Sequence, residues 1–342
     1  MRRLVGEPSN HVTQTPHRTV QVIAAILGKG SLLVLALSSL AFVSIAFAAA
    51  SWTTVAPMPT ARSSLGVTTG LDGRIYAIGG RVSSGAILNA AEAYSPATNS
   101  WVAVAPLPTA RTGLTVAAGS DGRIYAIGGR DAAGNIVNTV EAYNPRTNKW
   151  TTVAPMPTAR QVLAAATGAD GRIYAIGGST AGFGATVPTM EAYDARRNTW
   201  TTVAPMPTSR GGLAATTGRD GRIYAVGGTS SKDQDLHTAE AYDPSTNRWT
   251  PLAEMPTRRH ILGLAAGSDG RVYAVGGLGN GGQPVDTNEA YNPETNEWTA
   301  AAPMPTLRAA LGAATSPDGR IYAVGGRDKR FNVLNTVEAY SP

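Results

Sequence analysis

The chain has 342 residues, a formal net charge of +6 and no cysteine. The lack of cysteine excludes disulfides, thiolate metal sites and a cysteine nucleophile. Residues 1–50 hold four basic residues and one glutamate, which gives +3, so residues 51–342 carry the other +3. Because no basic cluster with interleaved aromatic residues is present, we do not expect the chain to bind nucleic acid.

Residues 1–50 differ in composition from the rest. Arg2, Arg3, Arg18 and Lys29 precede an uncharged run of 19 residues, 32–50, which contains Ala46-Phe47-Ala48 near its end. Basic residues, an apolar stretch and small residues in this order are typical of an export signal peptide. The alternative is an uncleaved anchor, because 19 apolar residues just span a bilayer. In either case we expect residues 51–342 to be exported (secreted, periplasmic or at the cell surface), with membrane contact only through this segment.

A single unit recurs six times after residue 50. Tryptophans occur 49 residues apart, with one interval of 50, at Trp52, Trp101, Trp150, Trp200, Trp249 and Trp298. Diglycines keep the same spacing, at residues 79–80, 128–129, 177–178, 227–228, 276–277 and 325–326. A fixed period of this length indicates a supersecondary unit that buries its apolar surface only against its neighbours.

Each unit contains four predicted strands, as the second copy illustrates. Residues 112–119 are small or β-branched, Asp121-Gly122 is a tight turn, and residues 123–127 lead to the diglycine. A loop of about ten residues precedes residues 140–143, and a turn rich in Asn, Pro and Thr precedes a strand that starts at Trp150. Asp-Gly between two extended runs is a strong hairpin signal. Four antiparallel strands follow from this pattern.

The entry arginine, the diglycine, the tyrosine of the third strand and the tryptophan of the fourth resemble the Kelch repeat, and the resemblance covers residues 52–342. It implies an all-β fold, a six-bladed β-propeller of four-stranded antiparallel blades. The last copy stops after Tyr340, so we expect the strand Ser51 to Val55 to complete the sixth blade and close the ring. The alternative, an open solenoid, requires polar capping repeats that the sequence lacks.

Repeat positions that carry an arginine are candidate ligand residues. If the first strand runs down from the entry arginine, the loops that differ between copies share one face with the arginines, and binding residues are often on such loops. Some Kelch adaptor domains of ubiquitin ligases hold acidic peptides with such arginines, and an unpaired ring of six forms a positive funnel. The candidates are Arg62, Arg111, Arg160, Arg210, Arg259 and Arg308.

The alternative is structural, and for any single arginine it is the interpretation we favour. All copies keep the residue, and each arginine then bonds to neighbouring carbonyls or pairs with a repeat glutamate. Those glutamates are Glu92, Glu141, Glu191, Glu240, Glu289 and Glu338. The recurring tryptophans and tyrosines are likewise expected to pack between blades.

Positions where the copies differ give further candidates. Gln161 and His260 follow entry arginines where the other copies have Ser, Thr, Gly or Ala. Phe183 and Phe331 lie in variable loops, and an exposed loop aromatic often anchors a partner, although local packing is the more common role. We therefore list these four residues with the arginines as candidate ligand-binding residues.

The sequence favours a binding module over an enzyme. We assign no catalytic residue, metal site or cofactor, because the propeller has only two histidines and its first strands are apolar. The expected partner is a protein or glycan, with acidic groups favoured. The alternative is a cofactor-free enzyme that acts on an acidic sugar, similar to the exported six-bladed Kelch mutarotase of N-acetylneuraminate.

Overall fold

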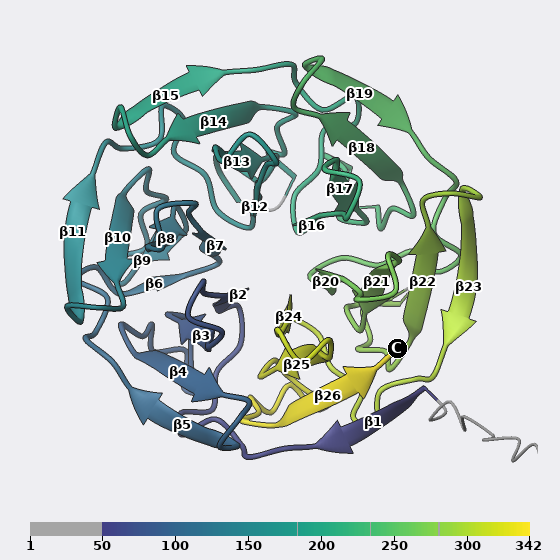
Figure 1. The fold of residues 1–342 in the computed structure, drawn as a ribbon, viewed down its shortest axis with the longest axis horizontal. Helices are drawn as coiled ribbons and strands as arrows, with labels where there is room; N and C mark the ends of the chain where they lie inside the picture. Colours follow the sequence, from purple (N-terminus) through teal and green to yellow (C-terminus); the bar gives the residue numbers. More distant parts are fainter. Residues whose placement is uncertain (1–49, 183, 233, 280) are drawn as a thin grey trace, which may run out of the picture. The chain divides into compact units, whose positions relative to one another are not determined.

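Six blades surround a central axis in the computed structural model, which describes residues 50–182, 184–232, 234–279 and 281–342 (Figure 1). The predicted export or anchor segment falls outside these residues apart from Ala50. Within the described part of the chain, no helix is long and apolar enough to cross a membrane. The expected all-β, six-bladed propeller is confirmed.

Every blade is a four-stranded antiparallel sheet, and the chain runs from its innermost strand outward. The first three blades consist of β2 (Gly66–Thr69), β3 (Ile75–Ile78), β4 (Ala91–Ser95) and β5 (Ser100–Ala103); β7 (Thr115–Ala118), β8 (Ile124–Ile127), β10 (Val140–Asn144) and β11 (Lys149–Val153); and β12 (Ala164–Thr167), β13 (Ile173–Ile176), β14 (Met190–Asp194) and β15 (Thr199–Thr202). The fourth and fifth consist of β16 (Ala214–Thr217), β17 (Ile223–Val226), β18 (Ala239–Asp243) and β19 (Arg248–Pro251); and β20 (Gly263–Ala266), β21 (Val272–Val275), β22 (Asn288–Asn292) and β23 (Glu297–Ala301).

The sixth blade joins the two ends of the described chain. It consists of β24 (Gly312–Thr315), β25 (Ile321–Val324), β26 (Val337–Ser341) and, outermost, β1 (Ser51–Thr54). β1 pairs with β26 in the register Trp52 to Tyr340, and Val55 N continues the ladder to Val337 O at 3.1 Å. The predicted closure by the N-terminal strand is confirmed, and it leaves β26 with partners on both sides.

The innermost strand of the second blade starts later than its sequence suggests. Arg111–Thr112 forms a separate short strand, β6, which pairs with β9 (Arg130–Asp131), and β7 begins only at Thr115. Gly113 lies between them with φ of +60°, outside the β region, so the chain turns there. The equivalent residues of the other copies also have positive φ, at Ser64, Val162, Gly212, Ile261 and Ala310.

These six residues form a closed ring of backbone hydrogen bonds around the axis. The N–H of each donates to the carbonyl of its counterpart in the preceding blade at 2.7–2.9 Å, and Ser64 donates to Ala310 to close the ring. Val162 and Ile261 adopt φ of +47° and +44°, which is rare for β-branched side chains. The ring links every blade to the next at one end of the channel.

The apolar cores lie between blades rather than within them. The second strands read Ile/Val-Tyr-Ala-Ile/Val and are completely buried, because each packs against a neighbouring blade on both sides. At the outer edge, each tryptophan indole donates to an alanine carbonyl of the preceding blade, as Trp101 Nε1 does to Ala56 O at 2.9 Å. Tyr76 and Tyr143, from adjacent blades, have ring centroids 5.8 Å apart. The expected aromatic packing between blades is confirmed.

The six entry arginines are fully buried and paired. Arg111 donates through Nη1 to the carbonyls of Gly128 and Thr139, both at 2.8 Å, and through Nη2 to Glu141 at 2.7 Å. Burial lowers the pKa of the Arg111 guanidinium, and Glu141 counteracts this shift. The other five arginines repeat this pairing with their own glutamates.

This pairing corrects the hypothesis that the arginine ring binds a ligand. A positive funnel required unpaired guanidinium groups at the surface, whereas all six have no exposed surface and a carboxylate partner. The correction applies to Arg62, Arg111, Arg160, Arg210, Arg259 and Arg308. These arginines instead bond to neighbouring carbonyls and to the repeat glutamates, as the structural alternative proposed.

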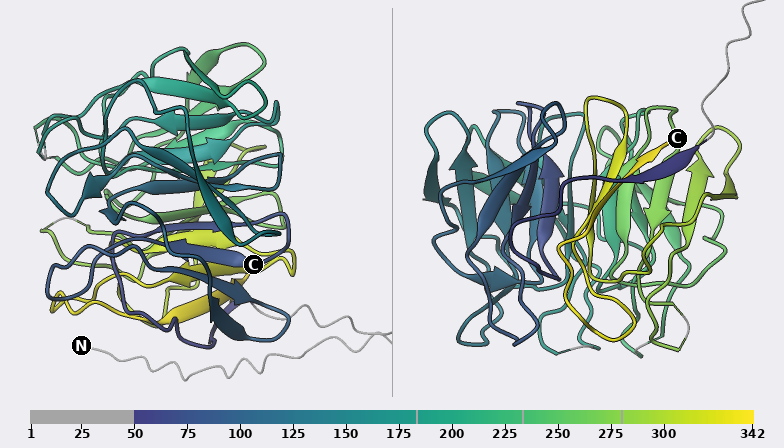
Figure 2. Two further views of the ribbon diagram at one scale, coloured as in Figure 1. Left: turned by 90° about the vertical axis from the view of Figure 1, so that its left-hand side faces the viewer. Right: turned by 90° about the horizontal axis from the view of Figure 1, so that it is seen from below.

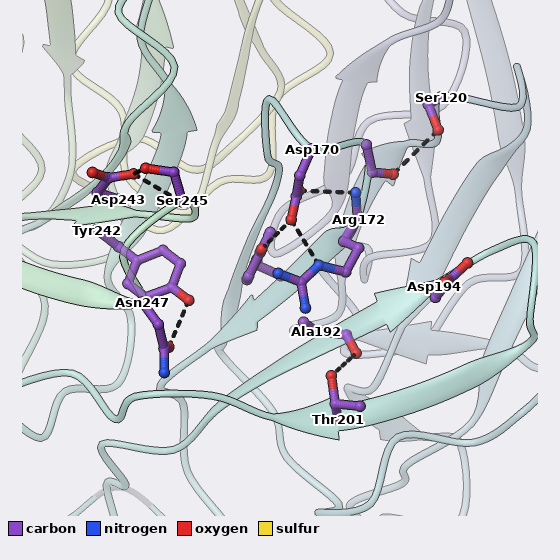
Figure 3. Close-up of polar contacts among 12 residues, drawn as sticks. Ser120, Asp170, Arg172, Ala192, Asp194, Thr201, Tyr242, Asp243, Ser245 and Asn247 are labelled. Carbon is purple, nitrogen blue, oxygen red and sulfur yellow. Dashed lines mark hydrogen bonds and ion pairs between the residues drawn. The ribbon is translucent and has the colours of Figure 1, made fainter.

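The Asp-Gly hairpins build a polar network on the opposite face, the turn face (Figure 3). Asp170 accepts hydrogen bonds from Arg172 Nε and from the Tyr174 hydroxyl, both at 2.7 Å. Burial opposes ionisation of Asp170, but these hydrogen bonds outweigh it and lower the pKa of the carboxyl. The pKa is lowered in the same way at Asp72, Asp121, Asp220 and Asp318.

We predict that Glu141→Gln strongly destabilises the propeller. The substitution leaves Arg111 charged and without a counter-ion in the interior, which costs about 3–5 kcal/mol. Replacing both partners, as Arg111→Met with Glu141→Leu, should restore much of the lost free energy of unfolding. The matched control, Arg197→Ala, removes an exposed ion pair to Asp194 and should leave the melting temperature unchanged. Equal losses for the single and double variants in denaturant unfolding would contradict the prediction.

We also predict that the propeller loses stability in acid. A carboxyl whose pKa is lowered on folding contributes stability above its unfolded pKa of about 3.9, and this contribution disappears as the pH falls through the lowered pKa. The melting temperature should therefore be level from about pH 7 to 5 and fall below about pH 4. Asp170→Asn should melt lower than the wild type at pH 7, with the difference shrinking in acid. A difference that stays constant down to pH 3 would contradict this assignment.

Candidate functional site

The two faces of the propeller differ in how much they vary. The turn face repeats the Asp-Gly hairpins and the Asn-containing turns, whereas the loops after the diglycines lie on the other face, the loop face (Figure 2, right, lower edge). Among the described residues, the loop face consists of residues 81–90, 130–139, 179–182, 184–189, 229–232, 234–238, 278–279, 281–287 and 327–336, together with the residues that follow the entry arginines. It is the candidate binding surface because a rigid frame holds loops of different sequence.

The channel offers little chemistry. A cavity of 140 Å³ lies beneath the backbone ring, and a second of 300 Å³ lies toward the turn face. The first is lined by Gly, Ala, Val, Leu, Ile, Ser and Thr and the second by Ala, Val, Leu and Thr, and none of the described lining residues is titratable. The innermost strands of blades six and one pack closely here, since a Cβ on Gly312 would overlap Val67. Titratable groups such as Asp235 and His260 are instead found around the channel opening on the loop face, which we call the mouth.

Short backbone bridges fix the residues of the mouth. In each blade, the residue after the entry arginine pairs with the residue after the diglycine, as Ser63 does with Arg81 and Gln161 with Ser179. Gln161 is partly exposed, and its Nε2 donates to Ala181 O at 3.3 Å. Gln161 thus lies at the mouth.

His260 lies at the mouth two blades from Gln161 and has an acidic neighbour. Its Nδ1 is 2.6 Å from Oδ1 of Asp235, although the alignment is not that of a regular hydrogen bond. Both side chains are about one-sixth exposed, at 16% and 15%. Asp235 belongs to the loop of the fourth blade and His260 to the fifth, so the pair forms only when the blades assemble. Asp235 has no counterpart in the repeat pattern that marks it as a candidate in the sequence.

The two candidate phenylalanines have different outcomes. Phe331 is half exposed, and its ring lies 5.0 Å from Cζ of Arg327. Phe183 lies outside the described residues. Of the two, Phe331 is therefore the aromatic group that the structure places on the loop face.

Three further arginines lie at the mouth and were not predicted from the sequence. Arg81, Arg130 and Arg327 directly follow the diglycines of the first, second and sixth blades, which are consecutive in the ring. The other three copies have Ser179, Thr229 and Leu278 at this position. The signal was present in the sequence as Gly-Gly-Arg in three of six copies.

The loop face is electrically polarised. The loops of blades six, one and two contain five basic and two acidic residues, which gives +3. Among the described residues, the loops of blades three, four and five contain Lys232, Asp235 and Asp286, which gives −1. We call the first group the basic arc; it comprises Arg81, Arg130, Arg327, Lys329 and Arg330. Such a surface attracts anionic ligands to one side of the mouth.

No cluster of three or more His, Cys, Asp or Glu residues that could hold a metal ion is found among the described residues.

Comparisons with known proteins agree with this architecture. The chain matches the Kelch motif over residues 62–108 and 111–157, and the KLHDC2/KLHL20/DRC7 Kelch-repeats domain over residues 163–342. A solved structure titled "Structure of YjhT" is similar with a TM-score of 0.70 and 17% sequence identity, over 83% of this chain and 95% of that chain. A comparison with curated proteins gives no match. The matched family models cover most of the repeat region, and the chain belongs to the Kelch-repeat family.

Proposed function

We propose that this protein is an exported binding module that holds a protein or glycan ligand with acidic groups on its loop face. A Kelch propeller is in general a frame for binding and interaction, and the polarised loop face is the observation that supports this function. Five basic side chains on three consecutive blades give an acidic ligand a preferred side and orientation. The proposal that the protein is exported rests only on the composition of residues 1–50.

A second candidate function is the conversion of sugar anomers, and the contact between His260 and Asp235 favours it. A histidine held by a carboxylate at the channel mouth has the composition of a general acid–base pair. The basic arc could bind the carboxylate of an acidic sugar nearby. This cofactor-free mutarotase remains the alternative to passive binding.

We predict that binding of an acidic ligand depends on charge at the loop face. The purified propeller should be screened against glycan and secreted-protein libraries, and each hit compared with the double variant Lys329→Glu, Arg330→Glu. Because both residues are exposed, charge reversal should leave the fold intact and weaken binding by about tenfold at low salt. The matched control reverses exposed residues of the turn face, Arg146→Glu with Lys149→Glu, and should not change the affinity. Equal effects of the two double variants would contradict a loop-face site.

We predict that His260 separates the two functions. If the propeller is a mutarotase for N-acetylneuraminate, His260→Gln should abolish the acceleration of anomer exchange measured by proton NMR, because no other titratable side chain follows an entry arginine. His237 is the matched control, since it too contacts a carboxylate, Glu254, at 3.1 Å, and His237→Gln should retain the activity. Absence of acceleration by the wild-type protein at high concentration would rule out the alternative.

A further inference from the structure

Arg81 and Arg327 hold equivalent positions on adjacent blades. The backbone of Arg81 pairs with Ser63 through two hydrogen bonds of 3.0 Å, and Arg327 pairs with Ala309 at 2.9 and 3.1 Å. Ser63 and Ala309 are buried, so these backbone pairs fix the positions of both arginines on the propeller. The two loops also touch, since Val333 N donates to Ser83 Oγ at 3.3 Å. The guanidinium groups therefore belong to one small region at the edge of the mouth.

Neither arginine has an acidic partner among the described residues. No side-chain hydrogen bond of Arg327 is found there either, and its Nε is fully buried without a partner. The entry arginines also leave Nε unpaired in most blades, but they use both Nη atoms on carbonyls and a glutamate. Burial, and then repulsion from Arg81, lower the pKa of Arg327. Two like charges near one another and without counter-ions favour an anion between them.

Phe331 adds a strained aromatic group to this region. Its φ is +62°, and its N–H donates to Asp328 O at 2.9 Å to close a tight turn. The equivalent turns of the first and second blades use Gly85 and Gly134, which adopt positive φ freely. A phenylalanine at such a position is unfavourable for the backbone and leaves the ring half exposed over Arg327. Because glycine serves in the equivalent turns, this strain makes Phe331 a candidate for a functional role.

We propose that Arg81, Arg327 and Phe331 form a subsite for a carboxylate group, with the two guanidinium groups binding its oxygens and the phenyl ring contacting the adjoining carbon skeleton. This inference rests on the proposed binding function and deepens it by naming the ligand chemistry. Arginine suits a carboxylate because its planar donors match the two oxygens. The carboxylate could belong to a sugar acid or to an acidic amino-acid side chain.

The test uses glucuronate and the peptide N-acetyl-glutamate-amide as separate probes. Binding is followed through the ¹⁵N-edited NMR signal of Arg327 Nε–H, which should shift because a carboxylate bound to the Nη atoms changes the charge distribution of the guanidinium. The double variant Arg81→Gln, Arg327→Gln should lower the affinity for the bound probe by about tenfold or more. Arg146→Gln is the matched control, because Arg146 is an exposed arginine of the turn face and lies outside the basic arc, and it should change the affinity less than about twofold.

Phe331→Gly separates binding from folding. Since glycine already occupies this position in two other loops, the variant should melt at the wild-type temperature or higher while it binds the probe more weakly. A larger shift with glucuronate assigns the subsite to sugar acids, and a larger shift with the peptide assigns it to acidic side chains.

Two outcomes would overturn the subsite. One is no shift of Arg327 Nε–H with either probe up to about 50 mM. The other is equal affinity of the wild type and the Arg81→Gln, Arg327→Gln variant for a ligand found in the library screen. In that second case the proposed binding function is retained, and only the assignment of the site to Arg81, Arg327 and Phe331 is wrong. If the library screen finds no ligand but a probe shifts the signal, the carboxylate subsite stands without the proposed partner.

Discussion

The propeller depends on the buried entry arginine of each blade, which connects strands within its own blade and contacts the preceding blade. The side chain of Arg111 ties β8 to β10 within its own blade, and its backbone carbonyl accepts a hydrogen bond of 2.8 Å from Gly80 of the preceding blade. A Cβ on Gly79 would lie only 2.6 Å from that carbonyl oxygen. The diglycine of one blade therefore contacts the entry arginine of the next blade, which explains why both recur in every copy.

Local and periodic features of the fold could be predicted from the sequence, because each is repeated and each strand has a short-range signal. The Asp-Gly turns, the blade number and the closure by the N-terminal strand, predicted at Ser51 to Val55, are of this kind. The environment of the arginines could not be decided in the same way. Arg111 and Glu141 are 30 residues apart in the sequence. Only the folded blade shows that Glu141 pairs with the guanidinium, which is therefore not available to a ligand.

The site was harder to predict than the frame. His260 was recognised as a departure from the repeat, but its neighbour Asp235 comes from a different blade and no sequence period connects them. Arg81 and Arg327 directly follow diglycines, which have a structural role in every copy. Their position therefore gave no reason to consider them as ligand-binding residues. Residues that serve recognition differ between copies, so periodicity, the strongest signal in this chain, does not find them.

The hydrogen-bonded ring at the channel mouth has a consequence for electrostatics. All six N–H groups donate in the same rotational sense, from each blade to the one before it. Their peptide dipoles therefore follow one another around the circle and largely cancel along the axis, unlike the aligned dipoles of a helix. The ring creates no directional field for an ion to follow into the channel. An approaching ligand instead experiences the sideways field of the charged loops, which draws it to the rim and not to the centre.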